Sequence, residues 1–252
     1  MTSLLETRGL RVTFGGLHAN DDVDLTVEEG RFVGLIGPNG AGKTTFIDAI
    51  TGFVPLSGGT VTFAGDDITD VPAHQRATRG LVRTFQSLEL FEDLSVRENL
   101  LAASERATWR DALADVFRPN RRSPVAEDVN WALDLVELTD AADRLPSDLS
   151  HGQRKLVSIA RAAAARPRLI LLDEPAAGLD SGESRQLGVE LRSLLDESVT
   201  VLLIDHDMDL VLGVCDEVYV LDFGRIIAHG TPEEIRRDPA VVAAYLGAGS
   251  GS

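Results

Sequence analysis

The chain from residue 1 to about residue 65 alternates apolar and polar side chains in short segments. Leu10–Phe14 and Val23–Val27 show this alternation, and the pairs Gly15–Gly16 and Asp21–Asp22 interrupt it. A period of two places successive side chains on opposite faces of a strand, while glycine and aspartate favour turns. This part is therefore predicted to form an antiparallel β-region.

Longer apolar runs predict a second kind of strand. Phe32–Ile36 is almost continuously apolar, as is typical of a strand buried on both faces, and it leads into a glycine-rich loop. After residue 150, further apolar strands alternate with a helical segment; these are strands at Leu169–Leu172, Val199–Ile204 and Glu217–Leu221, and a helix at Gly182–Asp196. Such alternation predicts parallel strands joined by crossover helices.

The segment between residues 87 and 149 has a helical pattern. Ser95 and Glu98 have the spacing of a capping box, and Ser123–Pro124 predicts a helix start with proline in the first turn. Apolar residues then recur every three or four positions, at Val125, Val129, Leu133 and Val136. We interpret the segment as a helical insert, with Arg118–Arg122 as an exposed turn.

The end of the chain predicts one more helix. Thr231 is followed by Pro232 and Glu234, which again match a capping box with proline in the first turn. The glycine- and serine-rich end, Gly247–Ser252, is predicted to be flexible.

Composition narrows the class of protein. The 252 residues carry 24 Lys+Arg and 40 Asp+Glu, a net charge of −16, which argues against a partner bound mainly through phosphates of nucleic acid. The single cysteine predicts a reducing compartment, and neither a signal peptide nor a membrane-spanning run is predicted. Only two of the basic residues are lysines, Lys43 and Lys155, and at least one of them needs an explanation.

The glycine-rich loop explains the first lysine. Gly37–Thr44 fits G-x-x-x-x-G-K-[ST], and a predicted strand precedes it while a predicted helix follows. Glycines let backbone amides turn around a phosphate, Lys43 supplies a compact charge that arginine does not, and Thr44 suits Mg²⁺. A glycine-rich turn with a chance lysine is the alternative, which this context disfavours. The loop alone is compatible with kinases, helicases and transport ATPases. A GTPase is disfavoured because the guanine-binding motif N-K-x-D is missing.

Two acids end an apolar strand in the second half of the chain. Leu169–Leu172 leads into Asp173 and Glu174, at the strand end where open α/β sheets place ligands. Asp173 suits a magnesium carboxylate, and Glu174 suits the group that orients or deprotonates an attacking water. The alternative is a strand that ends in solvated acids, which the phosphate loop disfavours.

Several motifs in order give a family resemblance. Leu149–Gln153 (LSHGQ), Asp173–Pro175, Gly178–Asp180 and Asp205–Asp207 follow the phosphate loop at spacings that resemble the nucleotide-binding subunit of an ABC transporter. Among ABC proteins, the chain is most similar to the ATPases of branched-chain amino-acid importers and their urea and amide relatives, in the segments Gly37–Thr45, Val82–Gln86 and Arg161–Asp180.

The resemblance implies an α/β P-loop NTPase of the ABC type. We expect a RecA-like mixed or parallel sheet, an N-terminal antiparallel β-subdomain and a helical insert, all in one ATPase domain over residues 1–252. Residues 1–86 and 150–230 would form the catalytic core, 87–149 a helical subdomain that ends at the signature motif, and 231–252 C-terminal helices and a flexible tail.

The family's roles carry over to matching positions. They imply catalysis by Glu174, His206, Lys43 and Gln86, and Mg²⁺ binding by Thr44, Gln86 and Asp173. They imply ATP contacts from Phe14, Gly37, Pro38, Asn39, Gly40, Ala41, Gly42, Lys43, Thr44, Thr45, Ser150, Gly152, Gln153 and Asp180. Phe14 would stack on adenine, its alternative being ordinary β-core.

The signature motif is also a helix start. Ser150 and Gln153 match a capping box, so the motif coincides with a helix N-terminus, which favours anions. In the family, two subunits pair head to tail and this helix faces the partner's γ-phosphate. His151 replaces the commonest glycine, and we expect its ring to lie near the Gly152 backbone without replacing that contact. Lys155, on the first turn, is expected to face solvent or charge near the phosphates.

The resemblance also implies partners. It predicts an ATPase at the cytoplasmic face of the membrane that acts with permease subunits, a second ATP-binding subunit (identical or different) and a solute-binding protein, but no nucleic acid. Ser87–Phe91 would lie where a permease docks, the alternative being loop packing. Arg144–Asp148 lacks the glutamate- and glycine-bearing loop of exporters, which favours an importer. A lipid or exporter ATPase and a soluble ABC ATPase acting on nucleic acid or ribosomes stay as alternatives.

Overall fold

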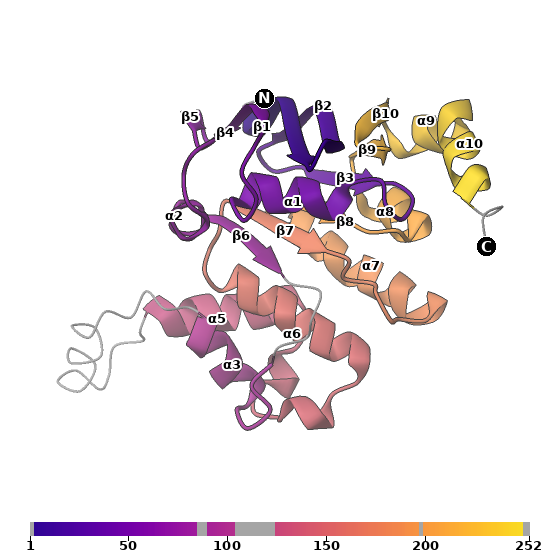
Figure 1. The fold of residues 1–252 in the computed structure, drawn as a ribbon. Coiled ribbons are helices and arrows are strands. Elements are labelled where there is room, and N and C mark those ends of the chain that lie inside the picture. Colours follow the sequence, from indigo (N-terminus) through magenta and orange to yellow (C-terminus); the bar gives the residue numbers. More distant parts are fainter. Residues whose placement is uncertain (1–2, 85–89, 104–123, 197–198, 249–252) are drawn as a thin grey trace.

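A computed structural model gives the fold (Figure 1) and describes residues 3–84, 90–103, 124–196 and 199–248. Its strands are β1 (Ser3–Phe14), β2 (Leu17–Glu28), β3 (Phe32–Ile36), β4 (Gly58–Phe63), β5 (Asp66–Asp67), β6 (Leu81–Thr84), β7 (Leu169–Asp173), β8 (Thr200–Ile204), β9 (Glu217–Asp222) and β10 (Arg225–Gly230). Its α-helices are α1 (Lys43–Thr51), α2 (Ala73–Thr78), α3 (Val96–Ala103), α5 (Pro124–Leu135), α6 (His151–Ala163), α7 (Ser181–Asp196), α8 (Met208–Val214), α9 (Pro232–Arg237) and α10 (Pro239–Ala248). Two short 3₁₀ helices are η1 (Thr139–Ala141) and η2 (Pro146–Asp148).

A mixed six-stranded sheet forms the centre of the molecule. Its strand order is β10-β9-β3-β8-β7-β6, with parallel pairing throughout except between β9 and β10. Every residue of β3, β7 and β8 is buried, as the continuous apolar runs predict. Since the strands run in the same direction, the loops that follow β3, β7 and β8 meet at one edge of the sheet.

The N-terminal region forms a second, antiparallel sheet. Its order is β2-β1-β4-β5, so the predicted antiparallel region is confirmed and extends through Phe63 to Asp67. Helix α1 lies between the two sheets (Figure 1), and its Phe46, Ile47 and Ile50 share one apolar core with residues of both sheets. Burial of this apolar helix face therefore holds the two sheets together.

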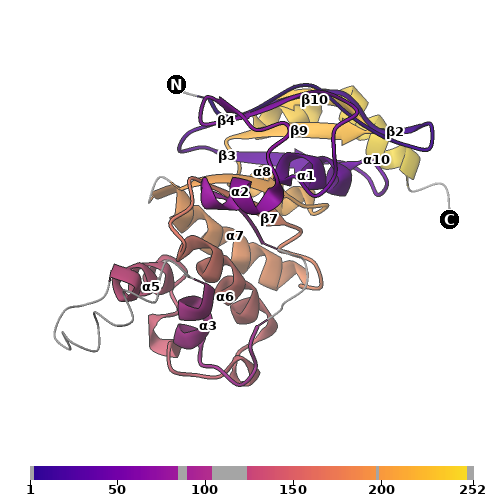
Figure 2. The ribbon, with the colours of Figure 1, turned by 60° about the vertical axis from the view of Figure 1, so that its left-hand side comes forward.

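The predicted helical segment lies beyond the other face of the six-stranded sheet, where α3, α5 and α6 pack together (Figure 2). The capping box is confirmed at α3, because the Ser95 amide donates to Glu98 Oε2 at 2.8 Å and the Glu98 amide donates to Ser95 Oγ at 3.3 Å. Helix α5 starts at Pro124 as predicted, and Val129 and Leu133 are buried. Its expected cap, Ser123, and the expected turn at Arg118–Arg122 lie outside the described residues.

The C-terminal end contains one confirmed prediction and one correction. The capping box at Thr231 is present and opens α9. The expected flexible end at Gly247 is wrong by two residues, because α10 continues through Gly247 to Ala248. Helices α9 and α10 both lie within the segment 231–252, where C-terminal helices were expected, whereas the short strand β10 and the helices α2 and α8 were not predicted. No helix in the described part of the chain is long and apolar enough to cross a membrane.

Candidate nucleotide-binding site

The phosphate loop joins β3 to α1 at the edge of the sheet, as predicted. Two of its glycines have no room for a side chain. A Cβ at Gly37 would lie 2.1 Å from the Leu221 carbonyl oxygen. Gly42 has φ +103°, and a Cβ there would lie 2.4 Å from the Ala19 carbonyl oxygen. The neighbouring strands thus fix a loop that only glycine can form at these positions.

A cavity of about 450 Å³ opens on this loop. Its lining comes from four separate segments, namely Leu17–Ala19 of the β1–β2 hairpin, Asn39–Thr45, Glu174, and Phe223–Gly224 of the β9–β10 turn. The first two loop residues, Gly37 and Pro38, are not part of this lining, so their predicted contact with ATP stays a prediction. The volume is in the range of small-ligand sites. The cavity combines backbone amides and a lysine at one end with exposed apolar side chains, Leu17 and Phe223, at another.

Lys43 is held against the inside of the loop. Its Nζ donates to the carbonyl oxygens of Gly37 at 2.6 Å and Pro38 at 3.2 Å, and only 6% of the residue is exposed. Burial lowers the pKa of Lys43 because it disfavours the charged form, and the nearby carboxylates of Glu174, Asp205 and Asp173 act in the opposite direction. Lys43 is therefore a positioned cation at the phosphate loop, as a phosphate site requires, and three carboxylates lie near it.

The two predicted acids at the end of β7 have different surroundings. Asp173 Oδ2 accepts from Arg83 Nη2 at 2.7 Å, and the same guanidinium bridges to Asp48 of α1 at 2.5 Å. Glu174 lines the cavity, has φ +47°, and donates its amide to the Ile204 carbonyl at 2.7 Å. Sequence reasoning missed Arg83, although it lies in the family-like segment Val82–Gln86.

His206, one of the residues predicted to act in catalysis, lies beside Glu174. His206 Nδ1 is 3.9 Å from Glu174 Oε2 and 3.3 Å from Asp205 Oδ1. Asp205 is fully buried and accepts hydrogen bonds from the amides of Ala176, His206 and Asp207 at 2.7 to 3.0 Å. Asp205 therefore fixes the loops after β7 and β8 against each other. No site role was predicted for Asp205 itself.

The signature motif forms the start of α6. Ser150 Oγ accepts from the Gln153 amide at 3.2 Å, and the Ser150 amide donates to Gln153 Oε1 at 3.0 Å, so the predicted capping box is confirmed. Ser150, Gly152 and Gln153 do not line the phosphate-loop cavity. His151 points toward Gly178, since its Nε2 would lie 3.4 Å from a Cβ at that position.

Asp180 caps the helix that follows. Its Oδ1 accepts from the amides of Gly182 at 2.7 Å and Glu183 at 2.9 Å, and these backbone hydrogen bonds lower the pKa of Asp180. Asp180 is exposed and lies outside the phosphate-loop cavity. Its predicted contact with ATP is therefore not formed within this cavity.

For the second lysine, the structure favours charge near the phosphates, one of its two expected surroundings, over solvent. Lys155 does not face solvent, because only 6% of it is exposed. Burial lowers the pKa of Lys155, and Asp205 and Glu174 act in the opposite direction. Helix α6 is buried on most of its surface, including Leu156, Val157 and Ile159, and this carries Lys155 inward. Both lysines of the chain thus lie near the same two acids.

The predicted roles of Phe14 and Gln86 are not tested by the cavity. Phe14 is 53% exposed, so the alternative that it is ordinary β-core is wrong, yet it does not line the cavity. Its predicted contact with adenine stays a prediction. Gln86 lies outside the described residues, as does most of Ser87–Phe91. Of that segment, Leu90 is buried and Phe91 is exposed.

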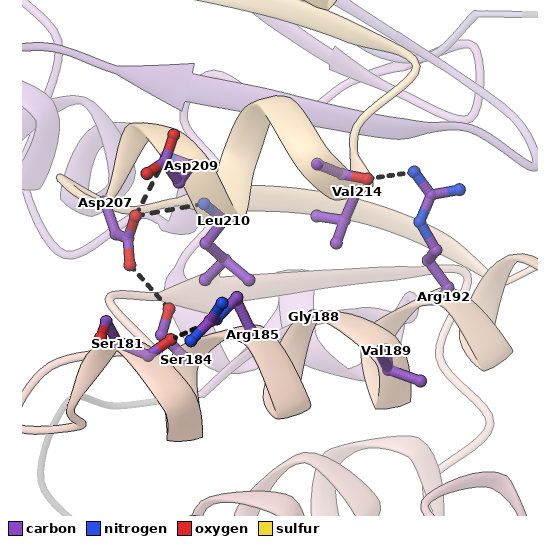
Figure 3. Close-up of a pocket in the computed structure, with 11 residues that line it drawn as sticks. Ser181, Ser184, Arg185, Gly188, Val189, Arg192, Asp207, Asp209, Leu210 and Val214 are labelled. Carbon is purple, nitrogen blue, oxygen red and sulfur yellow. Dashed lines mark hydrogen bonds between the residues drawn. The ribbon is translucent and has the colours of Figure 1, made fainter.

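A larger cavity of about 610 Å³ lies between α7 and α8 (Figure 3). Its polar groups already bond within the chain. Asp207 Oδ2 accepts from Ser184 Oγ at 2.6 Å, Arg185 Nε donates to the Ser181 carbonyl at 3.0 Å, and Arg192 donates to the Gly213 carbonyl. The phosphate-loop cavity, although smaller, presents a positioned lysine and one acid, Glu174, to a ligand.

Comparisons with known proteins agree with this geometry. A family model described as "ABC transporter" matches residues 20–177, and one described as "Branched-chain amino acid ATP-binding cassette transporter" matches residues 225–250. The high-affinity branched-chain amino acid transport ATP-binding proteins BraF of Pseudomonas aeruginosa and LivG of Escherichia coli are 44% and 40% identical over 97% of this chain and 98% of their own. The lipopolysaccharide export system ATP-binding protein LptB of Escherichia coli is 39% identical over 96% of this chain and 97% of its own.

Solved structures show the same fold. The crystal structure of the ADP conformation of MJ1267, an ATP-binding cassette of an ABC transporter, superimposes with a TM-score of 0.85 at 34% identity. The match covers 98% of this chain and all of MJ1267.

Proposed function

Because the chain belongs to the ABC transporter ATP-binding family, we propose that it hydrolyses MgATP to drive import of branched-chain amino acids through separate permeases. The observation that carries the ATPase part is the cavity in which Lys43, Glu174 and the glycine loop converge. The second family match and the transport relatives BraF and LivG support the choice of solute.

The residues at the phosphate loop fit a nucleoside triphosphate. The amides at the start of α1 and the positive end of its dipole would hold the phosphates, and Lys43 would turn from the loop carbonyls to the β- and γ-phosphate oxygens. Thr44, exposed in the cavity, would offer its hydroxyl to Mg²⁺ together with Asp173 and Gln86. Mg²⁺ would neutralise phosphate charge when bound.

Glu174 and His206 would act on the side of the γ-phosphate from which water attacks. Glu174 would orient and deprotonate water, a role supported by its position in the lining of the same cavity as Lys43. His206, held by Asp205, would contact the γ-phosphate. The backbone of Glu174 has a strained φ, and its amide donates to the Ile204 carbonyl, which holds this turn against β8.

The signature motif would serve the nucleotide of a second subunit. Ser150, Gly152, Gln153 and Asp180 lie outside the chain's own phosphate-loop cavity, which supports a role on another chain's ATP. Two ATPase chains, identical or different, would pair head to tail and open again after hydrolysis. They would act on the cytoplasmic face of the membrane as peripheral subunits, together with permeases and a solute-binding protein.

Reconstitution tests the solute. The chain is assembled in liposomes with its permeases and solute-binding protein, and ATP hydrolysis is measured with leucine, isoleucine and valine, with urea or an amide, and with lipopolysaccharide. We expect stimulation by the branched-chain amino acids, and the Glu174→Gln variant reports the background. Because LptB is also a relative, stimulation by lipopolysaccharide alone would favour a lipid exporter and overturn the importer proposal.

A further inference from the structure

An arginine from the neighbouring strand holds the carboxylate at the end of β7. Asp173 is only 9% exposed, and its Oδ2 accepts from Nη2 of Arg83 at 2.7 Å. The side chain of Arg83 is itself only 10% exposed. A carboxylate removed from water to this degree is costly unless a charged group pairs with it. Arg83 therefore compensates the charge of Asp173 inside the molecule.

The pairing of β6 with β7 explains how the two residues meet. The strands are parallel and Arg83 lies opposite Leu171, so Arg83, Leu171 and Asp173 share one face of the sheet. Leu171 belongs to the apolar core that also contains Phe46 and Ile47 of α1. This face of the sheet is therefore the one that α1 covers.

The same guanidinium also reaches α1. Arg83 Nη1 donates to Asp48 Oδ1 at 2.5 Å, so the planar fork takes one carboxylate from the helix and one from the strand. Asp48 follows Thr44 by four residues, which is about one turn of helix. The fork therefore ties the acid at the end of β7 to the helix whose first turn carries the proposed phosphate and Mg²⁺ groups.

The ion pair occupies only one oxygen of Asp173. Oδ2 contacts Arg83, whereas Oδ1 accepts no hydrogen bond within the part of the chain that the structure describes. Mg²⁺ in nucleotide sites is usually bound by one or two carboxylates together with phosphate oxygens. Arg83 therefore orients Asp173 and leaves Oδ1 for the cation that the proposed function requires.

Arg83 also supplies positive charge where carboxylates gather. Asp173, Glu174 and Asp205 lie near Lys43, and the last two also lie near the other lysine of the chain. The partner of Arg83 on α1 adds a fourth carboxylate. Without Arg83, four carboxylates would face two lysines, and such an excess of negative charge attracts a divalent cation.

We propose that Arg83 is a positioning residue that takes the place of a cation at Asp173 while the phosphate loop is empty, so that a divalent cation binds only together with nucleotide. A bound nucleotide brings phosphate oxygens, which add negative charge and ligands and so outweigh the repulsion between the guanidinium and the cation. Arg83 then stays on Oδ2 and orients the carboxylate. This inference rests on the proposed nucleotide site.

Binding of Mn²⁺ without nucleotide tests the inference. Mn²⁺ suits the same oxygen ligands as Mg²⁺, and the sharp electron paramagnetic resonance signal of the free ion is lost on binding. For Arg83→Gln we expect Mn²⁺ to bind at least about tenfold more tightly than to wild type. Adding Asp173→Asn should abolish this gain. Asp48→Asn is the matched control, because it keeps the pair between Arg83 and Asp173, and its Mn²⁺ affinity should equal that of wild type.

A gain of affinity separates this role from a merely structural one, since damaged packing weakens binding. Equal Mn²⁺ affinity in wild type and Arg83→Gln, with both shown by circular dichroism to be folded, would overturn the inference. A gain that survives Asp173→Asn would overturn it as well.

The wild-type chain gives a second test that needs no change at Arg83. We expect it to take up Mn²⁺ only when ATP is present, and uptake without nucleotide that Asp173→Asn removes would contradict the inference. Titration with ATP in EDTA checks the proposed function separately. If wild type and Lys43→Ala bind ATP equally, the nucleotide site is wrong, while Mn²⁺ binding without nucleotide still decides the role of Arg83.

Discussion

The starts of α1 and α6 are both helix N-termini proposed to meet ATP phosphates, yet they use their backbone amides differently. At α1 the N-cap is Gly42, and no side chain caps the first turn. At α6 the Ser150 and Gln153 side chains satisfy each other's amides in a complete capping box. No side chain occupies the amides of the first helix start, whereas at the second the Ser150 and Gln153 amides are already bonded within the chain.

This difference has a consequence for the order of events. A phosphate at α1 gains amide contacts without displacing a protein group, apart from turning Lys43 away from the loop carbonyls. A phosphate at α6 is offered fewer amides, because those of Ser150 and Gln153 are already bonded within the chain. We therefore propose that ATP binds first and most tightly at the phosphate loop, and that the signature contact follows and is readily broken after hydrolysis.

The strongest way to separate binding from chemistry is Glu174→Gln. The amide keeps the size of the side chain but cannot accept a proton, so hydrolysis should fall by about 100- to 10,000-fold. ATP binding at α1 should persist, because the phosphate loop is unchanged. Turnover is measured by phosphate release and binding by titration calorimetry. Turnover close to wild type would contradict the role of Glu174.

Lys43→Ala tests the phosphate-loop side of the comparison. Removing one positioned charge should lower turnover by about 100- to 1,000-fold and weaken ATP binding, measured in the same two assays. Lys43→Arg is the informative companion, because its planar guanidinium is wider than the ammonium that the loop carbonyls enclose. Full activity in Lys43→Ala would exclude the role of Lys43 in holding the phosphates. Full activity in Lys43→Arg would show that the loop does not need the compact shape of a lysine ammonium.

Ser150→Ala tests the second helix start, that of α6. Loss of the cap should lower the free energy of unfolding by about 1 kcal/mol and weaken ATP-dependent pairing, while ATP binding to the dilute monomer stays unchanged. Thr231→Ala is a matched control, because it removes the equivalent capping box from α9 and should cost similar stability without affecting pairing. Urea unfolding and light scattering with ATP give the two readouts. Weaker ATP binding by the Ser150→Ala monomer would contradict the division between the two helix starts.

The smallest effect is expected at Lys155. Because burial lowers its pKa below the ordinary 10.5, the protonated lysine is disfavoured in the folded state, and this cost is present at neutral pH. Lys155→Met should therefore be neutral to about 1 kcal/mol more stable at pH 7 in urea unfolding. The difference should shrink as the pH rises toward 10.5 and the wild-type lysine loses its proton. A less stable variant at pH 7 would show that attraction to Asp205 and Glu174 outweighs burial.

Much of the fold could be predicted because its signals are local. The buried strands at Phe32, Leu169 and Val201 are continuous apolar runs, and the capping boxes at Ser95, Ser150 and Thr231 depend on residues three positions apart. Strand β6 was missed because Arg83 interrupts its apolar pattern, and the ion pair that explains Arg83 joins it to Asp173, 90 residues later.

The site was predictable in its motifs and less so in its surroundings. The order of the motifs predicted Lys43, Glu174 and His206, and the structure brings Lys43 and His206 close to Glu174. Burial of a charged side chain depends on tertiary packing, so the inward position of Lys155 could not be read from a polar residue near a helix start. The same holds for the apolar mouth of the cavity at Leu17 and Phe223, which comes from two distant turns.

We propose that one chain binds ATP at α1 but needs a second chain, through the start of α6, to hydrolyse it. The most direct measurement is turnover per chain over a dilution series at saturating MgATP, with light scattering on the same samples. We predict that hydrolysis is found only where paired chains are present, while the monomer still binds one ATP. A monomer that hydrolyses ATP at the same rate per chain as the pair would contradict the account.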